Sequence, residues 1–255
     1  MTTLPNLTSH VSLALATANE VDLPSISNNM GSYLLGATAP DIRIITKQSR
    51  ELTHYSGLDS TVLGDGVERL LSENKEILDS GVSTPATQAF ISGYITHLIS
   101  DQTWIMTMYK PYFGNRGIFP SETLANIWDR ALQLEMDRQD RPAWEYASSH
   151  LISAAVDVSV PFISPDDLTK WSEWINEYAT GSFSWDRLRS LARRQTVTDE
   201  AEVEQSVEDF LSNIPAGLER ILSYMELDNI ETYKSRAISR SVESLENFWE
   251  LRYTA

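Results

Sequence analysis

Apolar residues recur at helical spacing through most of this 255-residue chain, whereas the alternating runs typical of β-strands are few. Only eleven glycines interrupt the pattern, and no tandem repeat is present. A chain with this pattern lacks the half-buried strands that a sheet needs, so we expect an all-α fold, a multi-helix bundle. We expect residues 1–195 to form the main helical domain and residues 196–255 to form a C-terminal helical extension packed on it.

One predicted helix, about residues 85–109, is apolar on most of its surface. Thr84 is placed to be its N-cap, and Pro85 suits the first helical position. Its length and apolar content predict a central, buried element. The segment from Thr38 to Gly57 is expected to be a long connection without a clear helix. The other helices are expected over residues 7–20, 29–36, 64–80, 121–138, 142–157, 165–179, 186–194, 199–226 and 229–252.

Acidic residues outnumber basic residues by 36 to 20, which gives a formal net charge of −16. This charge argues against a groove that binds nucleic acid, or a surface that binds an anionic bilayer, by neutralising phosphates. No apolar run reaches the roughly 18 residues of a membrane span. No Lys or Arg precedes Arg43, so the basic start of a signal peptide is missing. We therefore expect a soluble, cytoplasmic protein.

The chain contains no cysteine, so metal chemistry is left to histidine, aspartate and glutamate. His97 and Asp101 are four residues apart on the central predicted helix, where an imidazole and a carboxylate can reach one ion. Asp41, His54 and His10 add ligands from earlier segments, and together the five would suit one or two zinc-like ions. The alternative is structural: the histidines are polar core residues, and Asp41 caps a turn.

Four blocks carry these residues in a fixed order. They read LTSHV at residues 7–11, LLGATAPDI at 34–42, THY at 53–55, and AF followed by GYITHLISDQ between 89 and 102. In this order and at these separations, the blocks resemble the zinc-dependent phospholipase C family over about residues 5–110. The resemblance implies an all-α bundle of that family's type and a soluble metal-dependent hydrolase.

The resemblance also implies roles for single residues. Asp41, His54, His97 and Asp101 would hold one zinc ion, and Asp101 would bridge to a second ion that His10 also binds. Asp41 would have a further, catalytic role as a general base. The implied reaction is attack of a metal-bound hydroxide on the phosphorus of a phosphoester, in a small molecule or a lipid head group. Manganese or iron would also suit these ligands.

Three parts of the family pattern are missing, one of them a His-x-x-x-Glu pair expected after residue 107. Only nine residues precede His10, whereas the secreted phospholipases chelate zinc with a free N-terminal residue further upstream. A family histidine expected six residues after Asp101 falls on Thr107. Replacement ligands would come from later helices, where Asp137 and His150 are the main candidates. For Asp137, an ion pair at the helix surface is a better explanation than a metal ligand. For His150, a position in the core is the better explanation. Asp129 and Glu135 are further candidates.

These departures leave two other functions open. One is a diverged family member that catalyses another metal-assisted reaction on a small metabolite. The other is a non-catalytic, acidic helical interaction protein, whose metal would have a closed ligand shell. Catalytic zinc keeps a coordination position open, and five ligands spread over one or two ions leave such positions. This count favours an enzyme.

Overall fold

The computed structural model of the chain describes residues 6–79, 83–114, 118–152, 154–155, 157–193, 200–225 and 229–254. Every named element within these residues is a helix, and an isolated bridge between Val160 and Ile163 is their sole β pairing. The expected all-α fold is therefore confirmed. None of the described helices is long and apolar enough to cross a membrane.

The helices fall into two groups along the chain. The first group is α1 (Leu7–Glu20), α2 (Pro24–Ser27), α3 (Met30–Gly36), η1 (Ala39–Ile42), α4 (Arg43–Thr46), α5 (Arg50–His54), α6 (Asp65–Glu73), η2 (Lys75–Leu78), α7 (Pro85–Trp104) and η3 (Ile105–Phe113). The second group is α8 (Glu122–Gln139), α9 (Arg141–Leu151), α10 (Pro165–Thr180), α11 (Arg187–Ala192), α12 (Glu200–Ser212), α13 (Ile214–Leu222) and α14 (Asn229–Thr254).

The prediction that Thr38 to Gly57 forms a long connection without a clear helix is wrong. This segment contains η1, α4 and α5, each four or five residues long. One turn of helix is too short to show periodicity in the sequence. Lys47 and Tyr55 end α4 and α5 in the left-handed conformation, with φ of 61° and 56°. The segment therefore folds as a chain of single turns.

Four predicted helix boundaries also need correction. The helix expected over residues 64–80 ends at Glu73 and is followed by η2, and the helix expected over 142–157 ends at Leu151. The central helix is α-helical only to Trp104 and continues as the π-helix η3. The helix expected over 199–226 breaks at Asn213, whose side chain caps α13 through the backbone N–H of Ala216.

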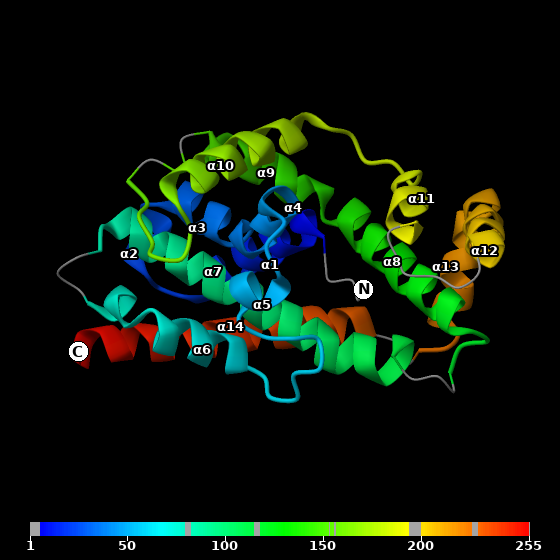
Figure 1. Cartoon of the computed structure of the whole chain (residues 1–255), viewed down its shortest axis with the longest axis horizontal. Coiled ribbons are helices and arrows are strands. Elements are labelled where there is room, and N and C mark those ends of the chain that lie inside the picture. The colour runs from blue at the N-terminus through cyan, green and yellow to red at the C-terminus, as the bar shows by residue number, and fades with distance from the viewer. Residues whose placement is uncertain are drawn as a thin grey trace.

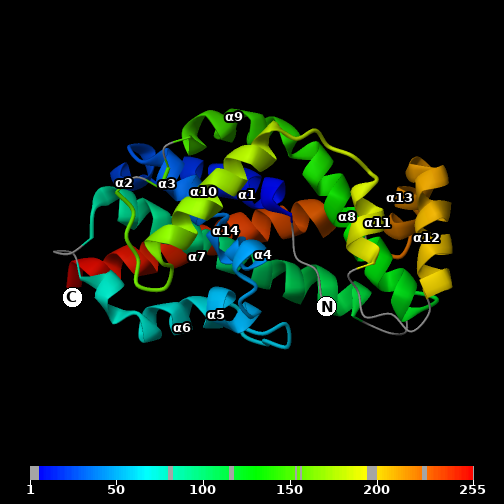
Figure 2. The same ribbon diagram turned by 45° about the horizontal axis from the view of Figure 1, so that its top comes forward.

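Helix α7 is at the centre of the molecule and begins as predicted, because the Thr84 hydroxyl accepts a hydrogen bond from the Thr87 backbone N–H. Helix α14 runs beside α7 along the long axis (Figure 1). Helices α1 and α3 pack on other sides of α7, with α9 against both of them. Helix α8 extends to one end of the molecule, where α11, α12 and α13 gather around it (Figure 2).

Two glycines allow α3 and α7 to cross at backbone contact. A Cβ atom on Gly93 would be 1.9 Å from the Tyr33 carbonyl oxygen, and one on Gly36 would be 2.0 Å from the Phe90 carbonyl oxygen. Any side chain at either position would push the helices apart. Since η1 follows α3 directly, this crossing sets the position of Asp41 relative to α7.

Candidate metal centre

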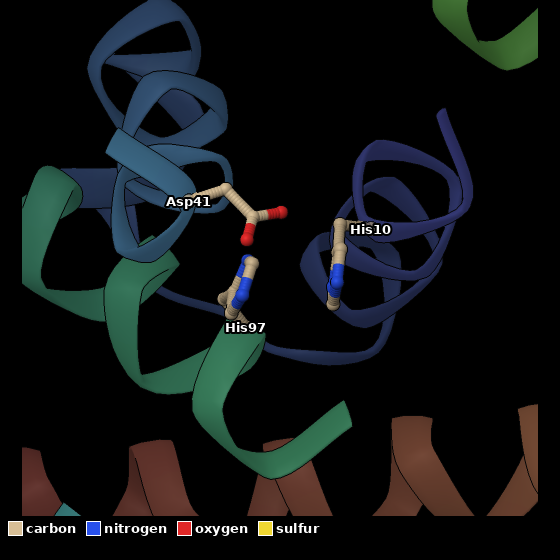
Figure 3. A group of neighbouring side chains, drawn as sticks. All are labelled: His10, Asp41 and His97. Atoms are coloured by element: carbon tan, nitrogen blue, oxygen red, sulfur yellow. The ribbon is translucent and has the colours of Figure 1, made fainter. Parts of the chain in front are cut away.

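The five predicted ligands come from four elements and meet at one place. His10 is on α1, Asp41 is on η1, and His54 is the last residue of α5. His97 and Asp101 lie one turn apart on α7. Figure 3 shows the side chains of His10, Asp41 and His97 converging from three elements. The histidine side chains and Asp101 are buried, whereas the side chain of Asp41 is 20% exposed.

The Nε2 atoms of all three histidines face the carboxylate of Asp101. His10 Nε2 lies 3.2 Å from Oδ1, and His54 Nε2 lies 3.2 Å from Oδ2. His97 Nε2 lies 3.7 Å from Oδ2 and 3.3 Å from His54 Nε2. The rings of His10 and His97 stack with centroids 3.7 Å apart. Asp41 completes the group, with its Oδ1 at 3.8 Å from His54 Nε2.

Each histidine uses its Nδ1 atom for a hydrogen bond directed away from the centre. The partners are Ser100 Oγ at 2.9 Å for His10, Thr53 Oγ1 at 2.9 Å for His54, and the Ala37 carbonyl oxygen at 2.8 Å for His97. This arrangement is the usual one for metal-binding histidines, in which an outer partner fixes the ring and leaves the second nitrogen for the ion.

The same hydrogen bonds decide which nitrogen carries the proton. The Ala37 carbonyl is an acceptor, so Nδ1 of His97 must donate to it. The Ser100 hydroxyl already donates to the His97 carbonyl oxygen at 2.9 Å, so Nδ1 of His10 must donate to Ser100 Oγ. The Thr53 hydroxyl likewise donates to the Arg50 carbonyl oxygen at 3.4 Å, which assigns the proton of His54 to Nδ1. All three Nε2 atoms therefore carry a free lone pair in the neutral rings.

Burial keeps two of these rings neutral. It lowers the pKa of His54 to about 4 and the pKa of His97 well below its ordinary value. Burial also opposes ionisation of Asp101, yet the Arg50 guanidinium beside it holds its pKa well below the ordinary range. For Asp41, burial raises the pKa to about 6. Near neutral pH the centre thus places the neutral imidazoles of His54 and His97 beside a charged carboxylate.

This donor set fits a cation. His10 Nε2 and Asp101 Oδ1 are buried and have no hydrogen-bond partner, although they lie only 3.2 Å apart. Lone pairs that face a carboxylate repel it unless a positive charge lies between them. Two groups of three residues could each hold an ion, because the ligand atoms within each group lie within 4.8 Å of one another. One group is His10, Asp41 and His97, and the other is His54, His97 and Asp101. The residues present would therefore suit one or two ions.

The later residues considered as replacement ligands are not in this cluster. Asp137 is buried and pairs with Arg187 of α11 at 2.6 Å, so its ion pair lies between helices and not on the surface. His150 is exposed on α9, and its ring is 5.2 Å from that of Tyr146. The core position expected for His150 is wrong, because the residue falls on the solvent side of α9. Asp129 accepts a hydrogen bond from Trp104 Nε1, and Glu135 pairs with Arg138.

Arg50 belongs to the centre and was not predicted from the sequence. Its Nη2 atom donates to Asp101 Oδ2 at 3.0 Å, and the residue is only 7% exposed. A signal existed, since Arg50 precedes His54 by four residues and so shares a face of α5 with it. Tyr233 of α14 supports the centre from behind, where its hydroxyl donates to the Ser100 carbonyl oxygen at 3.4 Å.

Together, the fold and the centre define an all-helical protein with a buried His and Asp site suited to divalent ions. The sequence model of the family described as zinc dependent phospholipase C matches residues 9–104, a segment that includes all five predicted ligands and Arg50. This segment is similar to the zinc-dependent phospholipase C family, and residues 105–255 lie outside the match. The match supports a metal-dependent hydrolase at the level of the family. No curated protein and no solved structure matches the chain.

Proposed function

We propose that this protein is a zinc-dependent hydrolase of phosphoesters, acting on a small molecule or a lipid head group. Asp41, His54, His97 and Asp101 would hold one ion, and His10 would bind a second ion together with Asp101. The observation that carries the proposal is the convergence of three histidine Nε2 atoms on one buried carboxylate. When bound, the ion would polarise the phosphoryl oxygen and make water a stronger nucleophile at neutral pH.

The side chains around the ligands would keep the centre in place. Ser100, Thr53 and the Ala37 carbonyl orient the three rings, so little reorganisation is needed when an ion binds. Backbone contact between α3 and α7 fixes the distance from Ala37 to His97. The binding residues are thus held by rigid helices, which suits a catalytic site.

Asp41 is the ligand residue with access to solvent. Its side chain is 20% exposed, whereas those of the three histidines are fully buried. A substrate and a water molecule would therefore approach on the side of Asp41. In that position a carboxylate oxygen of Asp41 can accept the proton of the attacking water, the role that the family resemblance gives it. This open side favours an enzyme over a protein with a purely structural metal.

The proposal is tested by metal content and by hydrolysis of a chromogenic phosphodiester, bis(p-nitrophenyl) phosphate. We expect the purified protein to retain zinc or a similar ion, and His97→Ala and Asp101→Ala to lose both the ion and hydrolysis. His150→Ala is the matched control, since this histidine is exposed on α9 and is expected to leave metal content and rate unchanged. Two equivalents of metal would favour phosphoester hydrolysis, and one would favour a diverged reaction. A chain that binds no metal after reconstitution, with stably folded variants, would refute the proposal.

A further inference from the structure

Arg50 has more hydrogen-bonding capacity than the protein uses. Its guanidinium carries five N–H groups, and Nη2 donates to Asp101 Oδ2 at 3.0 Å. The Nε and Nη1 atoms are buried and have no hydrogen-bond partner. Buried donors without partners are costly, and charged ones most of all. A residue of this kind beside a metal centre indicates a place for an acceptor that comes from outside the chain.

The charge around Arg50 indicates an anionic acceptor. The two carboxylates Asp41 and Asp101 and the guanidinium of Arg50 sum to one net negative charge, and a divalent ion would change this to one net positive charge. A guanidinium and a metal ion repel each other unless an anion lies between them. Asp101 already supplies one such charge. An anion that contacts both the ion and Arg50 would supply the other.

The segment that carries Arg50 is basic, in contrast to the chain as a whole. Residues 43–50 contain three basic residues and no acidic one, while the net charge of the chain is −16. Arg43 lies within electrostatic range of both Asp41 and His54. The basic segment thus follows directly after Asp41, the ligand residue on the open side. An anion approaching from this side meets positive charge in an otherwise acidic protein.

We propose that Arg50 is a substrate-binding residue that holds a phosphoryl oxyanion against the metal centre. The inference rests on the proposed function for the presence of a metal, and it adds the group that recognises the substrate. Guanidinium suits this role because its planar N–H donors match phosphate oxygens and its charge persists at every working pH. A free phosphate and the phosphoryl group of an ester share this chemistry.

The test uses inorganic phosphate, titrated by calorimetry into the metal-loaded protein after removal of excess metal. We expect Arg50→Gln to keep its metal and to bind phosphate about tenfold more weakly or worse. Arg240→Gln is the matched control, because this exposed arginine on α14 pairs with Glu243 on the surface. Comparing phosphate with methyl phosphate and dimethyl phosphate then distinguishes a site for the free anion from one for an ester.

A purely structural role for Arg50 gives different results. If Arg50→Gln holds its metal and binds phosphate within twofold of the wild type, the inference is wrong, and it is equally wrong if the wild type binds no phosphate. If Arg50→Gln releases the metal, Arg50→Lys decides, since lysine keeps the charge beside Asp101 and lacks the planar donors. Weaker phosphate binding by Arg50→Lys supports the inference, and unchanged binding overturns it. Binding is measured without turnover, so Arg50-dependent phosphate binding without hydrolysis would refute the proposed function alone.

Discussion

The carboxylate of Asp101 contacts more residues of this site than a single hydrogen bond would require. Its Oδ2 atom accepts from Arg50 and faces two imidazoles, while Oδ1 faces His10 without a hydrogen bond. The Ser100 hydroxyl and the Ala37 carbonyl determine which ring nitrogen of His10 and His97 carries the proton. Without a metal, burial keeps His54 and His97 neutral beside the charged Asp101. The free energy of unfolding of the protein must therefore depend on pH.

The metal-free protein is expected to lose stability in acid through His54. Its pKa is lowered to about 4 in the folded protein, so below its ordinary value of 6.5 the unfolded chain binds the proton more strongly. This group alone should cost roughly 3 kcal/mol of unfolding free energy between pH 6.5 and pH 4. Asp41 acts in the opposite direction, because its pKa is raised and its protonated form is favoured by folding as the pH falls.

Comparing the wild type with His54→Gln isolates this effect, because Asp41 is present in both proteins. Urea unfolding at pH 6.5 and pH 4, in the presence of a chelator, should show a loss of stability that is smaller in the variant by about 2–3 kcal/mol. Equal losses in the two proteins would mean that His54 is not held neutral by burial.

At the scale of elements, the sequence predicts the long helices and misses the short ones. Helices such as α1 and α10 repeat their apolar residues over three turns or more, and their ends are found to within a residue. The turns η1, α4 and α5 contain no repeat, and tertiary contacts place them. The five residues that converge at the centre could be predicted because motif blocks carry them. Arg50 was missed despite its spacing of four from His54, because arginine is usually a surface residue and only the fold shows that this one is buried.

The crossing of α3 and α7 predicts a large effect for Gly93→Ala. The new Cβ would be 1.9 Å from the Tyr33 carbonyl oxygen and 2.7 Å from the Ala37 backbone nitrogen, and neither atom can move without its helix. We expect a loss of about 3 kcal/mol in unfolding free energy. Metal binding should weaken as well, because the Ala37 carbonyl would leave Nδ1 of His97.

Urea unfolding and metal titration of Gly93→Ala check this prediction. Gly114→Ala is the matched control, since its Cβ would meet its nearest neighbour at 3.4 Å, an ordinary contact, and its effect should stay within about 0.5 kcal/mol. A Gly93→Ala protein as stable as the control would show that α3 and α7 do not touch through their backbones.

At the scale of the whole molecule, α14 joins two apolar clusters. One cluster surrounds α3, α7, α9 and α10 and includes Leu245 and Phe248 of α14. The other surrounds α8, η3 and α11 to α13 and includes Tyr233 and Ala237 of the same helix. A boundary near residue 195 would cut the second cluster in sequence, since η3 and α8 precede it while α12 and α13 follow it, and one continuous helix contributes to both clusters. The C-terminal extension is therefore expected to unfold together with the rest of the chain.

Two substitutions on α14 test this cooperativity, one for each cluster. Phe248→Ala and Tyr233→Ala should each cost about 3–5 kcal/mol, because both side chains are almost fully buried. If the chain unfolds as one unit, each variant shifts a single transition by the same amount in far-UV circular dichroism and in tryptophan fluorescence. Arg240→Ala on the exposed face of α14 should leave the midpoint unchanged. Two transitions, with Phe248→Ala moving one and Tyr233→Ala the other, would mean that the clusters fold independently and that α14 links two domains.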